Sequence, residues 1–459
     1  MKMYKLLFFR GKYEGTMLEK VFKLQEKHSS VKTELIAGLT TFLAMAYILG
    51  VNPQILGDAG MDKSSVFLAT AISAGFASIL MGLLANYPVS LAAGMGVNAL
   101  FAYTICGQMQ MSWYAALAAV FVSGLIFVVI SVTGIRKAII NAIPKQLKLA
   151  IGAGIGFFIA FVGLKNAGII AASPATFVTL GNFSTPSVLL AIFGILITIA
   201  LVVKKVPAGV FVGMVITAVI GIVAGMMGVE GMPMLPEKVI ETKLSLDAFG
   251  AFASGFGELF ADPFKAFIAL FSFLFVDFFD TAGTLVAVGN RVGLINEKGE
   301  LENAEKALLA DAIGTVAGAA LGTSTVTSFV ESTSGVEVGG RTGLTACTTG
   351  VLFVISIFFA PVVLASVTNA VTAPALVVVG IMMAQQLKGI DWDDLVYATA
   401  GFVTVIGMIL TYSISNGIAF GFISYVVAMV ANKRAKEVHI TVWILMVIFA
   451  LYFALPYMM

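Results

Sequence analysis

Long apolar stretches separated by short polar loops run through the whole chain of 459 residues. Many of them approach the roughly 20 residues that a helix needs to cross the hydrocarbon core of a bilayer. Counting them predicts about fourteen membrane crossings, and the last stretch, Ile440–Leu455, is left open as a further one. The hydrophobic pattern therefore predicts an all-α polytopic membrane protein.

Two of the apolar stretches begin with small and polar residues instead of a helical run. They are Ser90–Cys106 and Gly322–Gly335, the third and tenth segments along the chain. The second contains TSTVTSFVES, in which β-branched residues and alternation predict an extended backbone. Extended backbone at membrane depth is tolerated only where protein or a water-filled cavity satisfies its polar groups. We therefore expect short extended stretches in segments 3 and 10, inside the helix bundle.

The two halves of the chain repeat the same order of spans. Each half has two long spans, one short broken span and four more, and ATAIS at Ala69–Ser73 is similar to ADAIG at Ala310–Gly314, 241 residues later. Because seven is an odd number, two such halves must insert upside down relative to each other. Inverted repeats with discontinuous segments near the midplane are typical of secondary transporters. The pattern predicts a 7+7 inverted repeat.

Composition and charge agree with a membrane location. The chain is 59% hydrophobic and 11% charged, whereas soluble domains carry about 25% charged residues. Lysine and arginine in the short loops fall on one side when the spans are counted alternately, which marks that side as cytoplasmic. We therefore expect a cytoplasmic N-terminal tail (1–32), an extracellular connection (230–263) and a multi-pass protein of the cell (plasma or inner) membrane.

Several function classes are disfavoured by what the sequence lacks. The net charge is +2, and no basic stripe is interleaved with aromatic residues, which argues against a nucleic-acid partner. The two cysteines and two histidines give no disulfide framework and no metal-ligand spacing. No phosphate-binding loop, zinc-protease motif or nucleophile elbow occurs. We expect no cofactor, no metal and no enzymatic activity.

Acidic residues interrupt the apolar stretch Phe264–Gly289, where an ionised group costs roughly 3 kcal/mol. Asp277 and Asp280 recur with Thr281 and Thr284 at helical spacing, which predicts one polar face turned toward the bundle interior. Two carboxylates one turn apart repel each other, so one of them can hold a proton near neutral pH. This favours a proton-coupled mechanism. The alternative is a structural hydrogen-bonding pair that ties helices together.

Three further residues suit recognition of a flat, polar ring. Phe329 and Glu331 fall on the same side of the predicted extended stretch. An aromatic face beside a carboxylate suits a heterocycle that carries N–H donors. In the first half, Asn98 offers an amide with both donors and acceptors that can read a base edge, although it can equally cap a half-helix.

Several blocks of the sequence together resemble the AzgA-like purine permeases, a branch of the nucleobase–cation symporters (nucleobase–ascorbate transporter-like). The blocks lie between Thr33 and Val430 and include TELIAGLTTFLAMAYILGVNPQIL, GMGVNALFAY, FVDFFDTAGTL, ALLADAIGT and LGTSTVTSFVESTSGVEVGGRTGLT. The resemblance implies the fold of the uracil permease, with fourteen segments as two inverted sevens. It implies a core domain from 33–134 and 264–364, and a gate domain from 135–229 and 365–459.

The same resemblance implies the residues of the substrate site. The family's substrate-binding positions correspond to Asn98, Asp277 and Glu331, and Asp280 matches the second aspartate of its D-x-x-D motif. The hypothesis is a secondary active transporter that imports hypoxanthine, guanine or adenine with protons by alternating access. Phe329 stacks on the base, and Asp277, Asp280 and Glu331 are the candidate proton carriers.

The sequence leaves several alternatives open. The rivals are a carrier of another small anion or nucleobase (of the sulfate-permease type, or for uracil or xanthine), a channel and a membrane enzyme. Buried acidic groups suit an anion poorly, and a compact acidic site fits alternating access better than a pore. The preferred purine, coupling to protons or to sodium, and the formation of a homodimer are not decided by the sequence.

Overall fold

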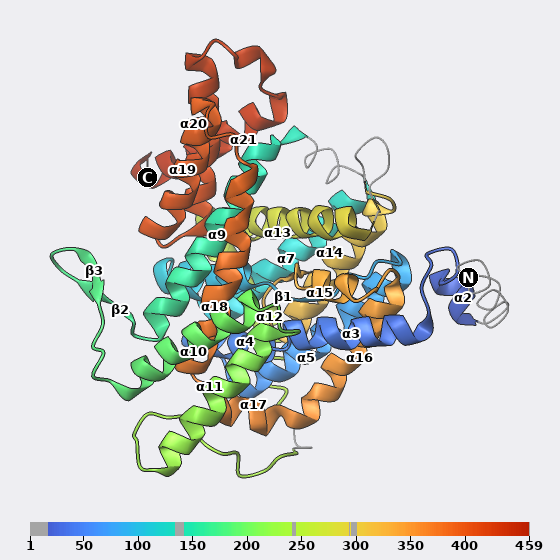
Figure 1. Ribbon diagram of the computed structural model, residues 1–459. Helices are drawn as coiled ribbons and strands as arrows, with labels where there is room; N and C mark the ends of the chain where they lie inside the picture. The colour runs from blue at the N-terminus through green and yellow to red at the C-terminus, as the bar shows by residue number, and fades with distance from the viewer. Residues whose placement is uncertain (1–16, 134–141, 241–244, 293, 295–300, 459) are drawn as a thin grey trace.

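The computed structural model describes residues 17–133, 142–240, 245–292, 294 and 301–458, and these are mostly helical (Figure 1). The helices of the first half are α2 (Met17–Phe22), α3 (Val31–Met45), α4 (Ile48–Asp58), α5 (Lys63–Leu84), α6 (Met95–Ala99), the π-helix η1 (Leu100–Gln108), α7 (Trp113–Val132), α9 (Lys145–Asn166), α10 (Pro186–Val203) and α11 (Gly209–Met226). Those of the second half are α12 (Phe252–Ala261), α13 (Pro263–Val292), α14 (Ala304–Leu321), α15 (Ser332–Glu337), α16 (Gly343–Ser356), α17 (Ala360–Ser366), α18 (Asn369–Ala384), α19 (Leu395–Leu410), α20 (Ile414–Ala431) and α21 (Ile440–Met458).

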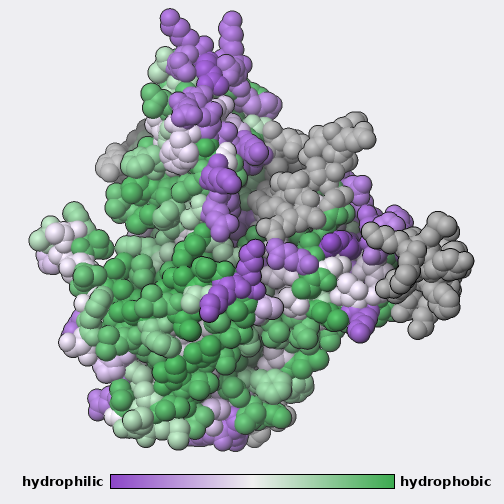
Figure 2. All heavy atoms as spheres, in the orientation of Figure 1, coloured by the Kyte–Doolittle hydropathy of each residue, from purple (hydrophilic) through white to green (hydrophobic). Residues whose placement is uncertain are grey.

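The apolar character of these helices fits a lipid environment. Within the described ranges, nine helices are long and apolar enough to cross a membrane, and Leu395–Leu410 and Ile440–Leu451 are shorter apolar helices. Figure 2 shows hydrophobic side chains over most of the visible body, with hydrophilic ones gathered at its upper projection. The chain is therefore a multi-pass helical membrane protein, as predicted. The count of fourteen segments and the 7+7 arrangement stay predictions.

The two broken segments meet as a pair of antiparallel strands. Strand β1 (Leu91–Ala93) pairs with β4 (Val326–Ser328), so that Ala92 lies opposite Thr327. The pairing continues beyond the strands, because the Phe329 N–H donates to the Ser90 carbonyl over 3.0 Å. Each strand thus satisfies the backbone of the other inside the bundle, which confirms the predicted extended stretches.

The extended stretch is shorter than the sequence pattern indicates. It ends at Ser328, and Glu331 has helical backbone angles (φ −59°, ψ −18°) as the residue that precedes α15. The predicted alternation therefore does not reach Glu331. The polar run that follows Phe329 begins a helix, since Ser334 N–H already donates to the Glu331 carbonyl over 2.9 Å.

Two elements were not anticipated from the sequence. The predicted connection 230–263 contains α12, which packs on α7 through Phe252 and Phe121, with ring centroids 4.1 Å apart. The aromatic residues Phe252, Phe256 and Phe260 recur every four residues, a helical spacing. A second pair of strands, the hairpin of β2 (Ile170–Ser173) and β3 (Phe177–Leu180), links α9 to α10.

Helices α5 and α16 lie against each other through facing glycines, because small residues let helix backbones approach closely. A Cβ atom placed on Gly350 would lie 2.6 Å from the Gly75 carbonyl oxygen and 2.8 Å from Cγ1 of Ile79. Both distances are shorter than real Cβ contacts, so neither helix can take a larger side chain here without moving.

The Gly350→Val variant should be destabilised by about 1–3 kcal/mol, because overpacking forces the two backbones apart. Its melting temperature in detergent, measured beside the unmodified protein, checks this. Gly257→Ala on α12 is the matched control, since a Cβ there meets no atom within 4 Å. Equal melting of Gly350→Val and the unmodified protein would show that the α5–α16 contact is not tight.

Candidate functional site

The acidic helix α13 passes beside the strand pair. It packs against β4 and α15, the elements that flank Glu331. Asp277 is fully buried, and Asp280 is partly buried one turn later. The Asp280 carboxylate accepts a hydrogen bond from Thr327 of β4 over 3.1 Å. The polar face predicted for this helix therefore does point into the protein.

Asp277 is linked to a second buried carboxylate through a threonine. The Thr281 hydroxyl donates to Asp311 on α14 over 2.7 Å and lies 3.4 Å from Oδ1 of Asp277. Thr281, Asp277 and Asp311 have no solvent exposure. Of the two aspartates one turn apart on α13, Asp280 thus contacts the strand pair, and Asp277 lies beside the threonine that bonds to α14.

Glu331 is held by a tyrosine from the first half of the chain. Tyr47 lies in the turn between α3 and α4, and its hydroxyl donates to Oε1 of Glu331 over 2.5 Å. The rings of Tyr47 and Phe329 are 6.5 Å apart and tilted by 42°. All three side chains are buried. A carboxylate, a hydroxyl and two aromatic faces are therefore brought together beside the end of β4.

Asn98 contacts the residues that precede β4, at the end of the strand away from Glu331. It lies in α6, directly after β1, and its side-chain oxygen accepts a hydrogen bond from Ser324. In the described part of the chain its Nδ2 amide is buried and makes no hydrogen bond. A buried amide donor without a partner is costly, so this group is suited to a ligand acceptor.

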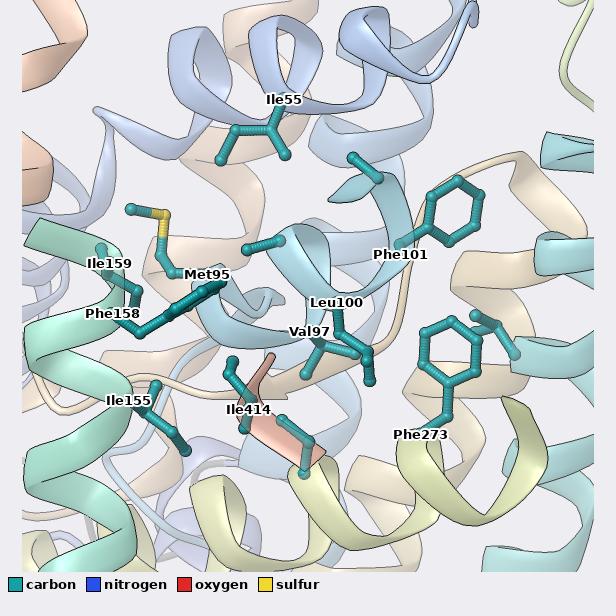
Figure 3. Close-up of a cluster of buried hydrophobic side chains, with 14 of the residues drawn as sticks. Ile55, Met95, Val97, Leu100, Phe101, Ile155, Phe158, Ile159, Phe273 and Ile414 are labelled. Carbon is teal, nitrogen blue, oxygen red and sulfur yellow. The ribbon is translucent and has the colours of Figure 1, made fainter. Parts of the chain in front are cut away.

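Apolar side chains surround the helix α6 that carries Asn98. Figure 3 shows Val97 and Leu100, next to Asn98, facing side chains of α9 and α20 such as Ile155 and Ile414. A Cβ atom added to Gly96 would come within 2.9 Å of Ile155 and 3.4 Å of Ile414. Such surroundings lower the local dielectric constant and strengthen hydrogen bonds to the carboxylates.

The arrangement therefore brings the sequence-predicted residues to one region. Asp280, Phe329 and Glu331 lie around β4. Asn98 is hydrogen-bonded to Ser324, which precedes β4, and Asp277 lies beside Thr281, which bonds to α14. In the described ranges, no three His, Cys, Asp or Glu side chains are grouped to hold a metal ion. Chemically, the region offers acceptors for N–H donors, one amide and aromatic faces.

Two polar residues of this region, Asp311 and Tyr47, were not predicted from the sequence. Asp311 carries a signal that could have found it, because it is a carboxylate within the mostly apolar helix α14 and the insertion cost applies to it as well. Tyr47 carries none, since a tyrosine in an apolar span is ordinary and only the folded structure shows what its hydroxyl contacts.

Comparison with known proteins places the chain among permeases. Residues 32–420 match the Permease family (Xan_ur_permease). The chain is 49% identical over 442 residues to the guanine/hypoxanthine permease PbuG of Bacillus subtilis (strain 168), covering 94% of this chain and 98% of the relative. It is 41% identical over 435 residues to the adenine permease AdeP of Escherichia coli (strain K12), covering 95% of each.

Solved structures share the fold at low sequence identity. The transmembrane domain of the cyanobacterial bicarbonate transporter BicA has a TM-score of 0.57 at 16% identity, over 87% of this chain and 96% of that chain. The structure of SLC26A9 has a TM-score of 0.59 at 12% identity, over 93% and 71%. These likenesses identify a helical transporter fold and carry no information on the substrate.

The Thr281→Val variant should lose about 1–3 kcal/mol of stability, because it leaves buried carboxylate oxygens without the threonine donor. Thr281→Ser, which keeps the hydroxyl, is the control and should melt near the unmodified protein. Thermal unfolding of the purified proteins in detergent measures both. If the valine variant melts no earlier than the serine variant, the hydroxyl does not link Asp277 to Asp311.

Proposed function

Because this chain belongs to the Permease family, and is a transporter and not an enzyme, we propose that it imports purine nucleobases with protons by alternating access. Relatives with 41–49% identity are named guanine/hypoxanthine and adenine permeases, which supports hypoxanthine, guanine and adenine as substrates. The observation that carries the proposal is the meeting of Glu331, Asp280 and Asn98 around one buried strand pair.

The roles follow from the chemistry of a purine edge. Glu331 and Asp277 accept hydrogen bonds from ring N–H groups, and the Asn98 amide donates to a ring nitrogen or carbonyl oxygen. Phe329 stacks on the base. Buried ionised groups cost energy in a low dielectric, so protonation of Asp277, Asp280 or Glu331 can accompany substrate binding and release.

The packing of the helices supports a core that moves against a gate. Helices α9, α18, α19 and α20 pack mainly on one another, and α3, α5, α7, α14 and α16 do the same. These two sets fall into the proposed gate (135–229 and 365–459) and the proposed core (33–134 and 264–364). The strand pair belongs to the core, so the core would carry the substrate past the gate.

A cluster of polar and aromatic side chains joins these two sets at one end. The hydroxyl of Tyr103 on η1 donates to Asp58 over 2.9 Å and accepts from Asn166 of α9 over 2.7 Å. Lys165 lies 4.6 Å from the centre of the Tyr412 ring and 3.2 Å from its hydroxyl. We name Asp58, Tyr103, Lys165, Asn166 and Tyr412 the outer latch, since the predicted orientation puts them outside.

Hydrogen bonds and cation–π contacts of the outer latch can open and re-form without separating large apolar surfaces. This suits an interface that must break in every transport cycle. The positions of lysine and arginine in the loops support a cytoplasmic N-terminus in the cell membrane.

An anion carrier is the second candidate, because the structural neighbours include a bicarbonate transporter. A small anion is repelled by nearby negative charge, and the ionisable groups of this region are carboxylates beside the single amide of Asn98. Uptake of labelled hypoxanthine, with adenine, guanine, xanthine, uracil and bicarbonate as competitors, separates the two candidates. We expect only purines to compete, and uptake to fall when a proton uncoupler is added with or without sodium.

Glu331→Gln should reduce purine uptake at least about tenfold, because a neutral amide loses a charge-assisted hydrogen bond. Initial uptake rates, normalised to the amount of protein in the membrane, measure the effect. Glu337→Gln, six residues later and exposed, is the matched control and should transport normally. Normal uptake by Glu331→Gln would remove this residue from the site.

Locking the outer latch should stop transport. The Gln108 amide reaches the carbonyls of Thr411 and Tyr412 over 3.5 and 3.4 Å, so cysteines at 108 and 411 lie within reach of a short, reducible thiol cross-linker. In a background with Cys106→Ala and Cys347→Ala, the cross-linked double variant should lose uptake and regain it on reduction. Each single cysteine is a control. Full uptake by the cross-linked protein would rule out movement here.

A further inference from the structure

Tyr47 occupies one oxygen of Glu331. Its hydroxyl donates to Oε1 over 2.5 Å, and neither residue is more than 5% exposed. In the described ranges, no other side chain donates a hydrogen bond to Glu331, so Oε2, the oxygen that Tyr47 does not hold, has no side-chain partner. Both partners are close to Asp280 as well, which interacts electrostatically with Tyr47 and Glu331.

The position of Tyr47 in the chain fixes this geometry. It lies where α3 ends and α4 begins, and i→i−3 bonds such as that from the Leu49 N–H to the Ala46 carbonyl tighten the backbone there. The ring has no solvent exposure and is tilted against Phe329. The hydroxyl therefore cannot swing away from Glu331 without repacking its surroundings.

Occupation of one carboxylate oxygen changes which base edge fits best. A carboxylate with both oxygens open can pair with two adjacent donors, as it does with the fork of an arginine. Guanine presents such a pair, the ring N1–H and the 2-amino group, whereas hypoxanthine presents N1–H alone on the same edge. With Oε1 engaged by Tyr47, a second base donor would have to share that oxygen with the tyrosine hydroxyl, so it contributes less than it would to a free carboxylate.

We propose that Tyr47 is a specificity-determining residue, which engages Oε1 of Glu331 and thereby weakens the advantage of guanine over purines with one N–H donor on this edge. The inference rests on the proposed function, because it requires a purine at Glu331. According to this inference, Tyr47 contributes a selectivity between purines that the Glu331 carboxylate alone would not have.

Tyr47→Phe tests the inference, because it removes the hydroxyl and keeps the ring. The dissociation constants of radiolabelled hypoxanthine and guanine are measured on the purified full-length protein in detergent. We expect the ratio of the hypoxanthine constant to the guanine constant to rise about tenfold, since guanine gains a second charge-assisted hydrogen bond. An unchanged ratio overturns the inference, even if both constants change together as a purely structural role requires.

Two comparisons make the result specific. Tyr87→Phe removes another buried hydroxyl, one bonded to the Glu302 backbone, and should leave the ratio unchanged. In a Glu331→Gln background the effect of Tyr47→Phe should vanish, because the two residues act as a pair; an equal effect there overturns the inference.

The remaining outcomes are also decisive. If Tyr47→Phe is not recovered from membranes, Tyr47→Leu replaces it with the same expected direction, since it too lacks the hydroxyl. If the unmodified protein binds no purine, the proposed function fails and this inference fails with it. If the unmodified protein binds purines and the ratio does not move, only the role of Tyr47 is lost.

Discussion

The cost of placing polar groups in a dry bundle governs the centre of this protein. Each unpaired backbone group at membrane depth costs several kcal/mol, and so does each ionised carboxylate. The structure meets both costs in one place. Strands β1 and β4 satisfy each other's backbone, and the threonines and serines around them donate to Asp280 and Asn98. Helix α13 and the turn at Tyr47 can then place carboxylate and hydroxyl groups beside the strands without contact with lipid.

Much of this arrangement could be predicted from the sequence, because polar residues that are costly to bury in a membrane stand out within apolar stretches. A carboxylate or a run of serine and threonine among apolar residues identified Asp277, Asp280, Glu331 and the extended stretch at 326–328. Side-chain contacts between different helices cannot be recognised in this way. Nothing local indicates that Thr281 contacts Asp311, and a tyrosine such as Tyr47 is unremarkable in an apolar span. Helix α12 was hidden because its aromatic stripe lies in a connection that reads as polar and acidic overall.

A shared fold does not imply a shared substrate. The solved structures that share this fold include a bicarbonate transporter, whereas this chain surrounds its strand pair with carboxylates. The common element is the scaffold, and the difference lies in a few side chains that project from it. Similarity of fold therefore indicates the architecture of the protein, and the acidic residues bear on the proposed substrate.

The pairing of β1 with β4 also has a consequence for biogenesis. Ala93 and Val326 lie opposite each other across the two strands but are separated by about half of the chain. At roughly 5–20 residues per second, a ribosome needs on the order of 10–50 s to make the second strand after the first. During that interval the backbone groups of β1 that pair with β4 have no partner, so they need a wet or protein-lined environment, although the Leu91 N–H already has Ser78. The early helices would have to be sheltered until β4 has been translated, so the two halves cannot mature as independent units.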